Sequence, residues 1–261
     1  MSSDYSKQYE DFIGALEKLF HIKSNEPIED MCNIITNTLI SKYQLSIKHL
    51  AKLIREAIRY NYASGANYFK ILKHIGADFL FADLEFEKED SIQYIVMHDQ
   101  IDKFKEYSVQ HSILGDKKFL KITNFDIDSF FEDVDVELTL IEACAYFGSV
   151  NIFYFLISNY NIKITGNCLS YAVIGGNQDI INECMKENKM GIDCLRSIIR
   201  THNHKLFEYV LDRSLYRFSD LYGKYWYLPK ENNLMNDKKY KSIYEDIITY
   251  QNLNAVFILF K

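Results

Sequence analysis

The segment THNH, residues 201–204, contains the most suggestive chemical groups of this 261-residue sequence. Together with Cys194, the side chains of His202 and His204 would offer the nitrogen and sulfur ligands that zinc prefers. Their spacing does not match a set of zinc ligands, and no second cluster completes a site. We therefore expect a backbone role for His202, and we expect neither a metal nor another cofactor.

Two further motifs resemble functional loops without completing them. The segment FDIDSFFEDVDVE, residues 125–137, places Asp126, Asp128 and Glu137 at the first, third and twelfth positions of a calcium loop. Phe130 and Phe131 stand where that loop needs a polar residue and a glycine, which favours a solvated acidic connection. The glycine pair at 175–176 lacks the lysine of a phosphate loop. No nucleophile has a recognisable base, so we expect no enzymatic activity.

The composition indicates an all-α protein. Apolar residues make up 48% of the chain, with two prolines and ten glycines, so few residues interrupt helices. The formal net charge of −6 argues against nucleic acid as a partner.

The same sequence carries few signals for export or membrane insertion. No apolar stretch reaches the roughly 18 residues of a membrane span, and the amino terminus shows no signal pattern. The five cysteines contain no C-x-x-C pair and are expected to be reduced core residues. We therefore expect a cytoplasmic protein without stable membrane insertion.

An internal repeat explains much of the chain. EACAYFGSVNIFYFLI, residues 142–157, and SYAVIGGNQDIINECM, residues 170–185, share the same order of small, polar and apolar positions. Gly148 aligns with Gly176, 28 residues later, and His202 follows after another 26. Fainter copies place Asp99 and Gln251 at the same position. The order predicts stacked units of two short antiparallel helices.

The shared position is the tight turn between the two helices. Such a turn commonly needs one residue with positive φ, which glycine adopts freely and Asp or His tolerates. We therefore predict turn roles for Asp99, Gly148, Gly176 and His202, with Gln251 as the least suited residue.

The run from Thr139 to Gly148, TLIEACAYFG, resembles the T-P-L-H-x-A-A-x-x-G opening of ankyrin repeats, departing from it at Leu140 and Glu142. The spacing is shorter than the usual ankyrin period of about 33 residues. More narrowly, the chain is similar to a large family of protozoan ankyrin proteins, in which a helical domain of unknown function precedes the repeats. CLSYAVIGGNQDIINECMKENK and CLRSIIRTHN carry this similarity. The resemblance implies a protein-binding scaffold and supplies no catalytic residues.

We expect two regions: a helical capping domain over residues 1–88, and degenerate repeats over 89–261. The cap would cover one end of the stack. Within it, SIKHLAKLIREAIRY presents an apolar stripe and a basic side formed by Lys48, Lys52, Arg55 and Arg59. This basic side is interpreted either as a solvated helix face or as a contact for an anionic membrane surface, an acidic partner or a small ligand.

The predicted partner is another protein, bound through a groove along exposed positions before each turn. These positions are Met97, His98, Tyr146, Phe147, Ile174, Arg200 and Thr201. An insert at about 214–242 adds the aromatic residues Tyr222, Tyr225 and Trp226 as a second binding surface or as packing across the repeat edge. The alternative is a regulatory or targeting domain that acts through its basic amino-terminal helix.

The last helix of the sequence, AVFILFK, is apolar almost all round. An apolar flank of this kind needs a cover. The insert is the first candidate, a second copy of the chain is the next, and further repeats are a third. Self-association through the last repeat is therefore the second-ranked expectation.

Overall fold

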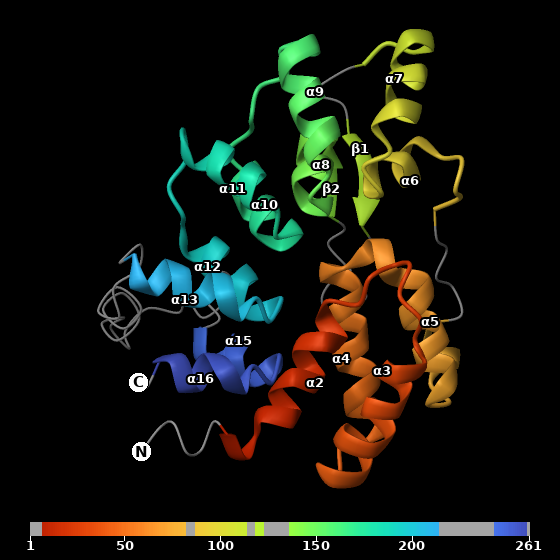
Figure 1. The fold of residues 1–261 in the computed structure, drawn as a ribbon, viewed down its shortest axis with the longest axis vertical. Helices are drawn as coiled ribbons and strands as arrows, with labels where there is room; N and C mark the ends of the chain where they lie inside the picture. The colour runs from red at the N-terminus through yellow and green to blue at the C-terminus, as the bar shows by residue number, and fades with distance from the viewer. Residues whose placement is uncertain (1–6, 82–86, 114–117, 123–135, 214–242, 260–261) are drawn as a thin grey trace, which may run out of the picture.

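The computed structural model describes residues 7–81, 87–113, 118–122, 136–213 and 243–259 (Figure 1). Helices dominate these ranges, with one short two-stranded ribbon among them, so the predicted all-α class is confirmed. Among the described helices, none is both long and apolar enough to cross a membrane.

The amino-terminal unit is a small helical bundle with its own core. Its helix α4 begins after Ser46, whose side chain accepts a hydrogen bond from the backbone N–H of His49 and so caps the first turn. The side chain of Asn61, just beyond α4, donates to the carbonyl of Ile22 at 2.7 Å and so joins the end of α4 to the segment that follows α2. The elements are α2 (Glu10–Phe20), α3 (Glu29–Ile34), the π-helical η1 (Ile35–Lys42), α4 (Ile47–Tyr60), η2 (Tyr62–Ser64), α5 (Gly65–His74) and η3 (Asp78–Phe81).

The predicted apolar stripe of α4 is buried in this core. The expected basic face is not observed as such. Lys48 is exposed, but the side chain of Arg55 is only 3% exposed. The guanidinium of Arg55 is therefore not available to a membrane surface. A continuous basic face, solvated or membrane-bound, is not present on this helix.

The second unit consists of helix pairs in chain order (Figure 1). Within each pair the first helix turns directly into the second, and the first helices of successive pairs pack side by side. The pairs are α6 (Ile92–Met97) with α7 (Ile101–Gln110), α8 (Leu140–Phe147) with α9 (Val150–Tyr160), α10 (Cys168–Gly175) with α11 (Gln178–Met185), α12 (Ile192–Arg200) with α13 (His204–Asp212), and α15 (Ile243–Thr249) with α16 (Leu253–Leu259).

Every pair has a left-handed residue at its turn. The φ angles are 49° at Asp99, 70° at Gly148, 69° at Gly176, 54° at His202 and 50° at Gln251. The repeated positions of the sequence therefore coincide with the same backbone geometry, including at Gln251.

Polar side chains join neighbouring pairs at these turns. The carboxylate of Asp99 accepts hydrogen bonds from the backbone N–H of Asn151 at 3.1 Å and of Ile152 at 3.0 Å. In this way the first turn satisfies free N–H groups at the start of α9. The side-chain amide of Asn252 likewise donates to the carbonyl of Ile199 at 2.7 Å. The stack is thus held by hydrogen bonds as well as by its apolar core.

Helix α8 follows a short antiparallel ribbon formed by β1 (Lys118–Ile122) and β2 (Val136–Thr139). Leu120 pairs with Leu138 in its register, and both side chains are buried. Glu137 therefore belongs to a strand rather than to an acidic loop. Asp126, Asp128, Phe130 and Phe131 lie outside the described residues.

The aromatic insert also lies outside the described residues, so Tyr222, Tyr225 and Trp226 keep only their sequence-based interpretation. In α16, the side chains of Val256, Phe257 and Ile258 are partly buried. Phe260 is beyond the described range. Coverage of this flank by the insert or by a second copy stays a prediction.

Candidate functional site

The amino-terminal unit lies against the turn ends of several helix pairs rather than over one end of the stack. At the second pair, the hydroxyl of Tyr146 donates a hydrogen bond to the backbone carbonyl of Arg59. At the fourth pair, the ring of Phe20 stacks on His202 with 4.4 Å between centroids. The expected position over the first repeat is therefore wrong.

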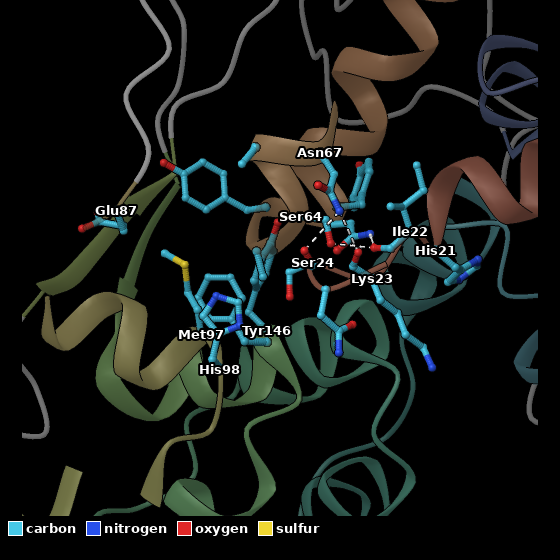
Figure 2. Close-up of a pocket in the computed structure, with 18 of the residues that line it drawn as sticks. His21, Ile22, Lys23, Ser24, Ser64, Asn67, Glu87, Met97, His98 and Tyr146 are labelled. Carbon is cyan, nitrogen blue, oxygen red and sulfur yellow. Dashed lines mark hydrogen bonds between the residues drawn. The ribbon is translucent and has the colours of Figure 1, made fainter. Parts of the chain in front are cut away.

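Between these contacts lies a cavity of about 960 Å³ (Figure 2). One wall comes from the amino-terminal unit, including residues 20–25 and the start of α5. The other wall comes from the ends of the first helices in the stack. It contains six of the predicted groove residues: Met97, His98, Tyr146, Phe147, Ile174 and Thr201.

These six residues differ from the predicted open groove in their exposure. Met97, Tyr146 and Thr201 are only 7%, 5% and 4% exposed, whereas the other three are partly exposed. The amino-terminal unit encloses this face of the stack, which the repeat pattern alone does not reveal. Thr201 also satisfies its hydroxyl locally, by donating to the carbonyl of Ser197 at 2.8 Å.

The wall from the amino-terminal unit is held in place by buried polar groups. The side-chain amide of Asn67 donates to the carbonyls of Lys23 at 2.9 Å and Ser24 at 3.1 Å. The hydroxyl of Ser64 donates to the carbonyl of Ile22 at 2.6 Å. Figure 2 shows these bonds, which join Ser64 at the end of η2 and Asn67 of α5 to the loop that follows α2. These bonds therefore fix the loop in place as part of the cavity wall.

One end of the cavity combines carboxylates with aromatic rings, and we call it the acidic corner: Glu87, Glu89, Tyr62, Tyr94 and His98. The rings of Tyr94 and His98 lie 4.1 Å apart. Burial and the charge of Glu87 raise the pKa of Tyr62, while burial lowers the pKa of His98 against the opposing effect of Glu89.

Sequence reasoning did not select four of these five residues. Glu87 and Glu89 belong to an acidic run before Ser91, the residue that caps α6 through its hydroxyl. An acidic run at a helix start is usually a capping feature. Only the fold brings it opposite the amino-terminal unit.

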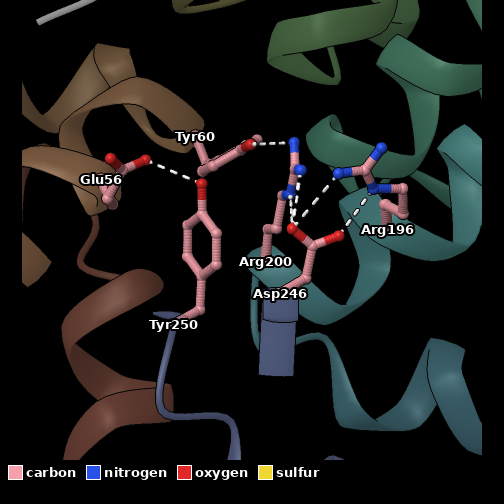
Figure 3. Close-up of polar contacts among 6 residues, drawn as sticks. All are labelled: Glu56, Tyr60, Arg196, Arg200, Asp246 and Tyr250. Carbon is pink, nitrogen blue, oxygen red and sulfur yellow. Dashed lines mark hydrogen bonds and ion pairs between the residues drawn. The ribbon is translucent and has the colours of Figure 1, made fainter. Parts of the chain in front are cut away.

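Arg200, the seventh predicted groove residue, is instead part of a polar network beside the cavity (Figure 3). The buried carboxylate of Asp246 accepts from Nη2 of Arg200 at 2.8 Å and from Nε of Arg196 at 2.6 Å. Arg200 also donates to the hydroxyl of Tyr60 at 3.3 Å, and Tyr250 donates to Glu56 at 2.9 Å. The network therefore joins α4 to the fourth and fifth pairs.

The cysteines and histidines do not form a reactive centre in the described ranges. All five cysteines are free and buried, and burial raises the pKa of the Cys184 thiol to about 12. Such thiols are poor nucleophiles at neutral pH. Within the same ranges, no three histidine, cysteine, aspartate or glutamate side chains are grouped to hold a metal ion.

Comparison with known proteins gives one similarity. Residues 160–234 match the family model of a domain of unknown function (DUF3447). The matched range begins at the end of α9, contains α10 to α13 and continues into residues outside the described part. No curated protein and no solved structure matches the chain.

Proposed function

We propose that this protein is a non-catalytic scaffold with an ankyrin-like stack of helix pairs, and that its central cavity receives a segment of a partner protein. The observation that carries this proposal is the cavity itself. Its volume of about 960 Å³ lies at the upper end of the range for ligand pockets, roughly 300–1,000 Å³. It therefore has room for several side chains of a bound segment.

The lining supports a binding role. Phe147 and Ile174 remain partly exposed inside the cavity, and Met97 contributes a polarisable thioether. Aromatic residues in enclosed positions are the side chains that commonly dominate binding energy at protein interfaces. The hydrogen-bonded loop of Lys23 and Ser24 supplies a rigid opposite wall, which lowers the entropy lost on binding.

Photo-crosslinking in the cell of origin tests this proposal. A benzoylphenylalanine probe at Phe147 reports on the cavity, and the same probe at Val109, an exposed site away from it, reports on the outer surface. We expect discrete crosslinked partners from position 147 that are absent from position 109.

A second variant shows whether the cavity is responsible. Ala66 is exposed and lines the cavity, so Ala66→Trp fills part of it with little disturbance of the core. We expect this change to remove the crosslinks from position 147, while Val109→Trp leaves them unchanged. Thermal melts establish that both variants are folded. Crosslinks that persist in folded Ala66→Trp protein would refute binding in the cavity.

A further inference from the structure

The carboxylates of the acidic corner have no cationic partner within the described part of the chain. Glu87 accepts a hydrogen bond from the hydroxyl of Ser91 at 3.2 Å. Neither Glu87 nor Glu89 forms an ion pair with a lysine or arginine of the described residues. Figure 2 shows Glu87 on the same side of the cavity as Met97 and His98, with Lys23 on the opposite side. Negative charge is thus concentrated at one end.

The same end is rich in aromatic rings. Tyr62, Tyr94, Tyr146 and Phe147 all line the cavity, and the rings of Tyr146 and Phe147 are 5.0 Å apart in an edge-to-face arrangement. The faces of aromatic rings attract cations, most strongly where water is excluded. His98 adds no fixed positive charge at neutral pH, because burial holds its pKa below the ordinary value.

The backbone of the stack also favours a cation in the cavity. Helices α6, α8 and α10 end at Met97, Phe147 and Gly175, and all three residues line the cavity. The carboxyl end of a helix carries a partial negative charge, which favours a nearby cation. The end of α6, next to His98, therefore adds to the negative charge of the acidic corner, and the ends of α8 and α10 add partial negative charge along the same cavity wall.

We infer that the acidic corner binds the side chain of a lysine or arginine carried by a partner protein segment. This inference rests on the proposed function, since it names the residue type that the cavity selects. The ammonium or guanidinium group lies between the carboxylates of Glu87 and Glu89 and the rings of Tyr62 and Tyr94. Lys23 and Lys70 stand on the other wall, so the preference for a cation is confined to this corner.

Fluorescein-labelled heptapeptide pools test the preference directly. The central residue is lysine, arginine, norleucine or glutamate, the other six positions are randomised, and binding to the full chain is followed by fluorescence anisotropy. Norleucine matches the length of the lysine stem without its charge. We expect the lysine or arginine pool to bind at least about fivefold more tightly than the norleucine pool, and the glutamate pool to bind most weakly.

The variant Glu87→Gln/Glu89→Gln tests whether the preference for a basic residue depends on the two carboxylates of the acidic corner. We expect it to weaken binding of the basic pool about fivefold, to the level of the norleucine pool, and to leave the norleucine pool unchanged. The matched control Asp102→Asn/Glu106→Gln makes the same charge change on exposed residues of α7, outside the cavity lining, and should have little effect.

Three results would overturn the inference: equal affinity for the lysine and norleucine pools, a basic preference that survives Glu87→Gln/Glu89→Gln, or no binding by any pool. Equal binding of all pools that is lost in Ala66→Trp would overturn cation selection and still support a binding cavity. A failure of the proposed function, binding in the cavity, is detected separately. It would appear as crosslinks from position 147 that persist when Ala66→Trp fills the cavity.

Discussion

Gly175 packs directly on the backbone of Gly148. A Cβ atom at Gly175 would lie 2.8 Å from the amide nitrogen of Gly148 and 2.3 Å from the carbonyl oxygen of Ala145. Conversely, a Cβ at Gly148 would lie 3.0 Å from the carbonyl oxygen of Gly175. Two successive helix pairs therefore meet through bare backbone at the edge of the cavity.

This contact predicts that one methyl group added at Gly175 destabilises the protein. Gly175→Ala should lower the free energy of unfolding by about 1–3 kcal/mol, because the backbone of α8 has to shift. Gly166→Ala is the control, since nothing lies within 4 Å of its added Cβ. Urea unfolding measures both. Equal stability of the two variants would show that the pairs do not approach so closely.

The buried carboxylate of Asp246 predicts a second effect. Asp246→Asn should lower the free energy of unfolding by about 3 kcal/mol, because Arg196 and Arg200 lose the charge that compensates them in a largely buried position. Asp102→Asn removes an exposed charge 4.0 Å from Lys105 and should cost less than about 1 kcal/mol. A small change at Asp246 would contradict a structural role for the network.

The stability of the protein should fall in mild acid. Burial lowers the pKa of His202 to about 3, far below its ordinary value near 6.5. Between these values the unfolded chain binds a proton that the folded protein excludes. The contribution of His202 to the free energy of unfolding is therefore fully present above about pH 6.5. It decreases toward pH 3, with a slope approaching about 1.4 kcal/mol per pH unit.

Chemical unfolding at several pH values measures this slope. His202→Asn retains a residue that tolerates positive φ and removes the titrating ring, so its slope should be smaller, although loss of the Phe20 stack lowers its stability at pH 7. Nearby His204 contributes in the same direction, because burial also lowers its pKa, whereas Glu17 and Glu208 oppose that effect. An unchanged slope in His202→Asn would refute the assignment.

The guanidinium of Arg55 predicts a stabilising substitution. Its Nε and Nη1 groups are buried and have no hydrogen-bond acceptor among the residues that the structure describes. Arg55→Met should therefore raise the free energy of unfolding by about 1 kcal/mol, because the cost of burying unpaired N–H groups disappears. Lys48→Met, at an exposed position of the same helix, should change it by less than about 0.5 kcal/mol. A lower melting temperature for Arg55→Met would contradict this explanation.

Local sequence patterns account for the helices and their turns, because apolar spacing and the need for positive φ each depend on only a few residues. The enclosed position of Tyr146 depends instead on Arg59, 87 residues earlier. No periodicity reports such a contact. Six of the seven predicted groove residues therefore line one cavity, and three of these six are buried rather than exposed as in an open groove.

The polar network was missed for a related reason. Arg196 and Arg200 are one helical turn apart, beside the apolar positions Leu195, Ile198 and Ile199. Two arginines so close to a buried stripe are a signal for an acidic partner. Asp246, however, lies in a helix 50 residues after Arg196, beyond an insert with no repeat pattern. Long sequence separation therefore hid the network.

The pairing of Glu56 with Tyr250 also has a consequence for biosynthesis. The two residues are 194 positions apart, so this contact adds to the contact order of the chain and slows the last step of folding. The amino-terminal unit leaves the ribosome before the stack, and the buried residues of its core, apart from Tyr250, all lie within residues 12–77. Its contact with the fifth helix pair must wait until that pair has emerged. A nascent chain therefore carries both walls of the cavity, with the contacts at Tyr146 and His202, before it has the last contact between them.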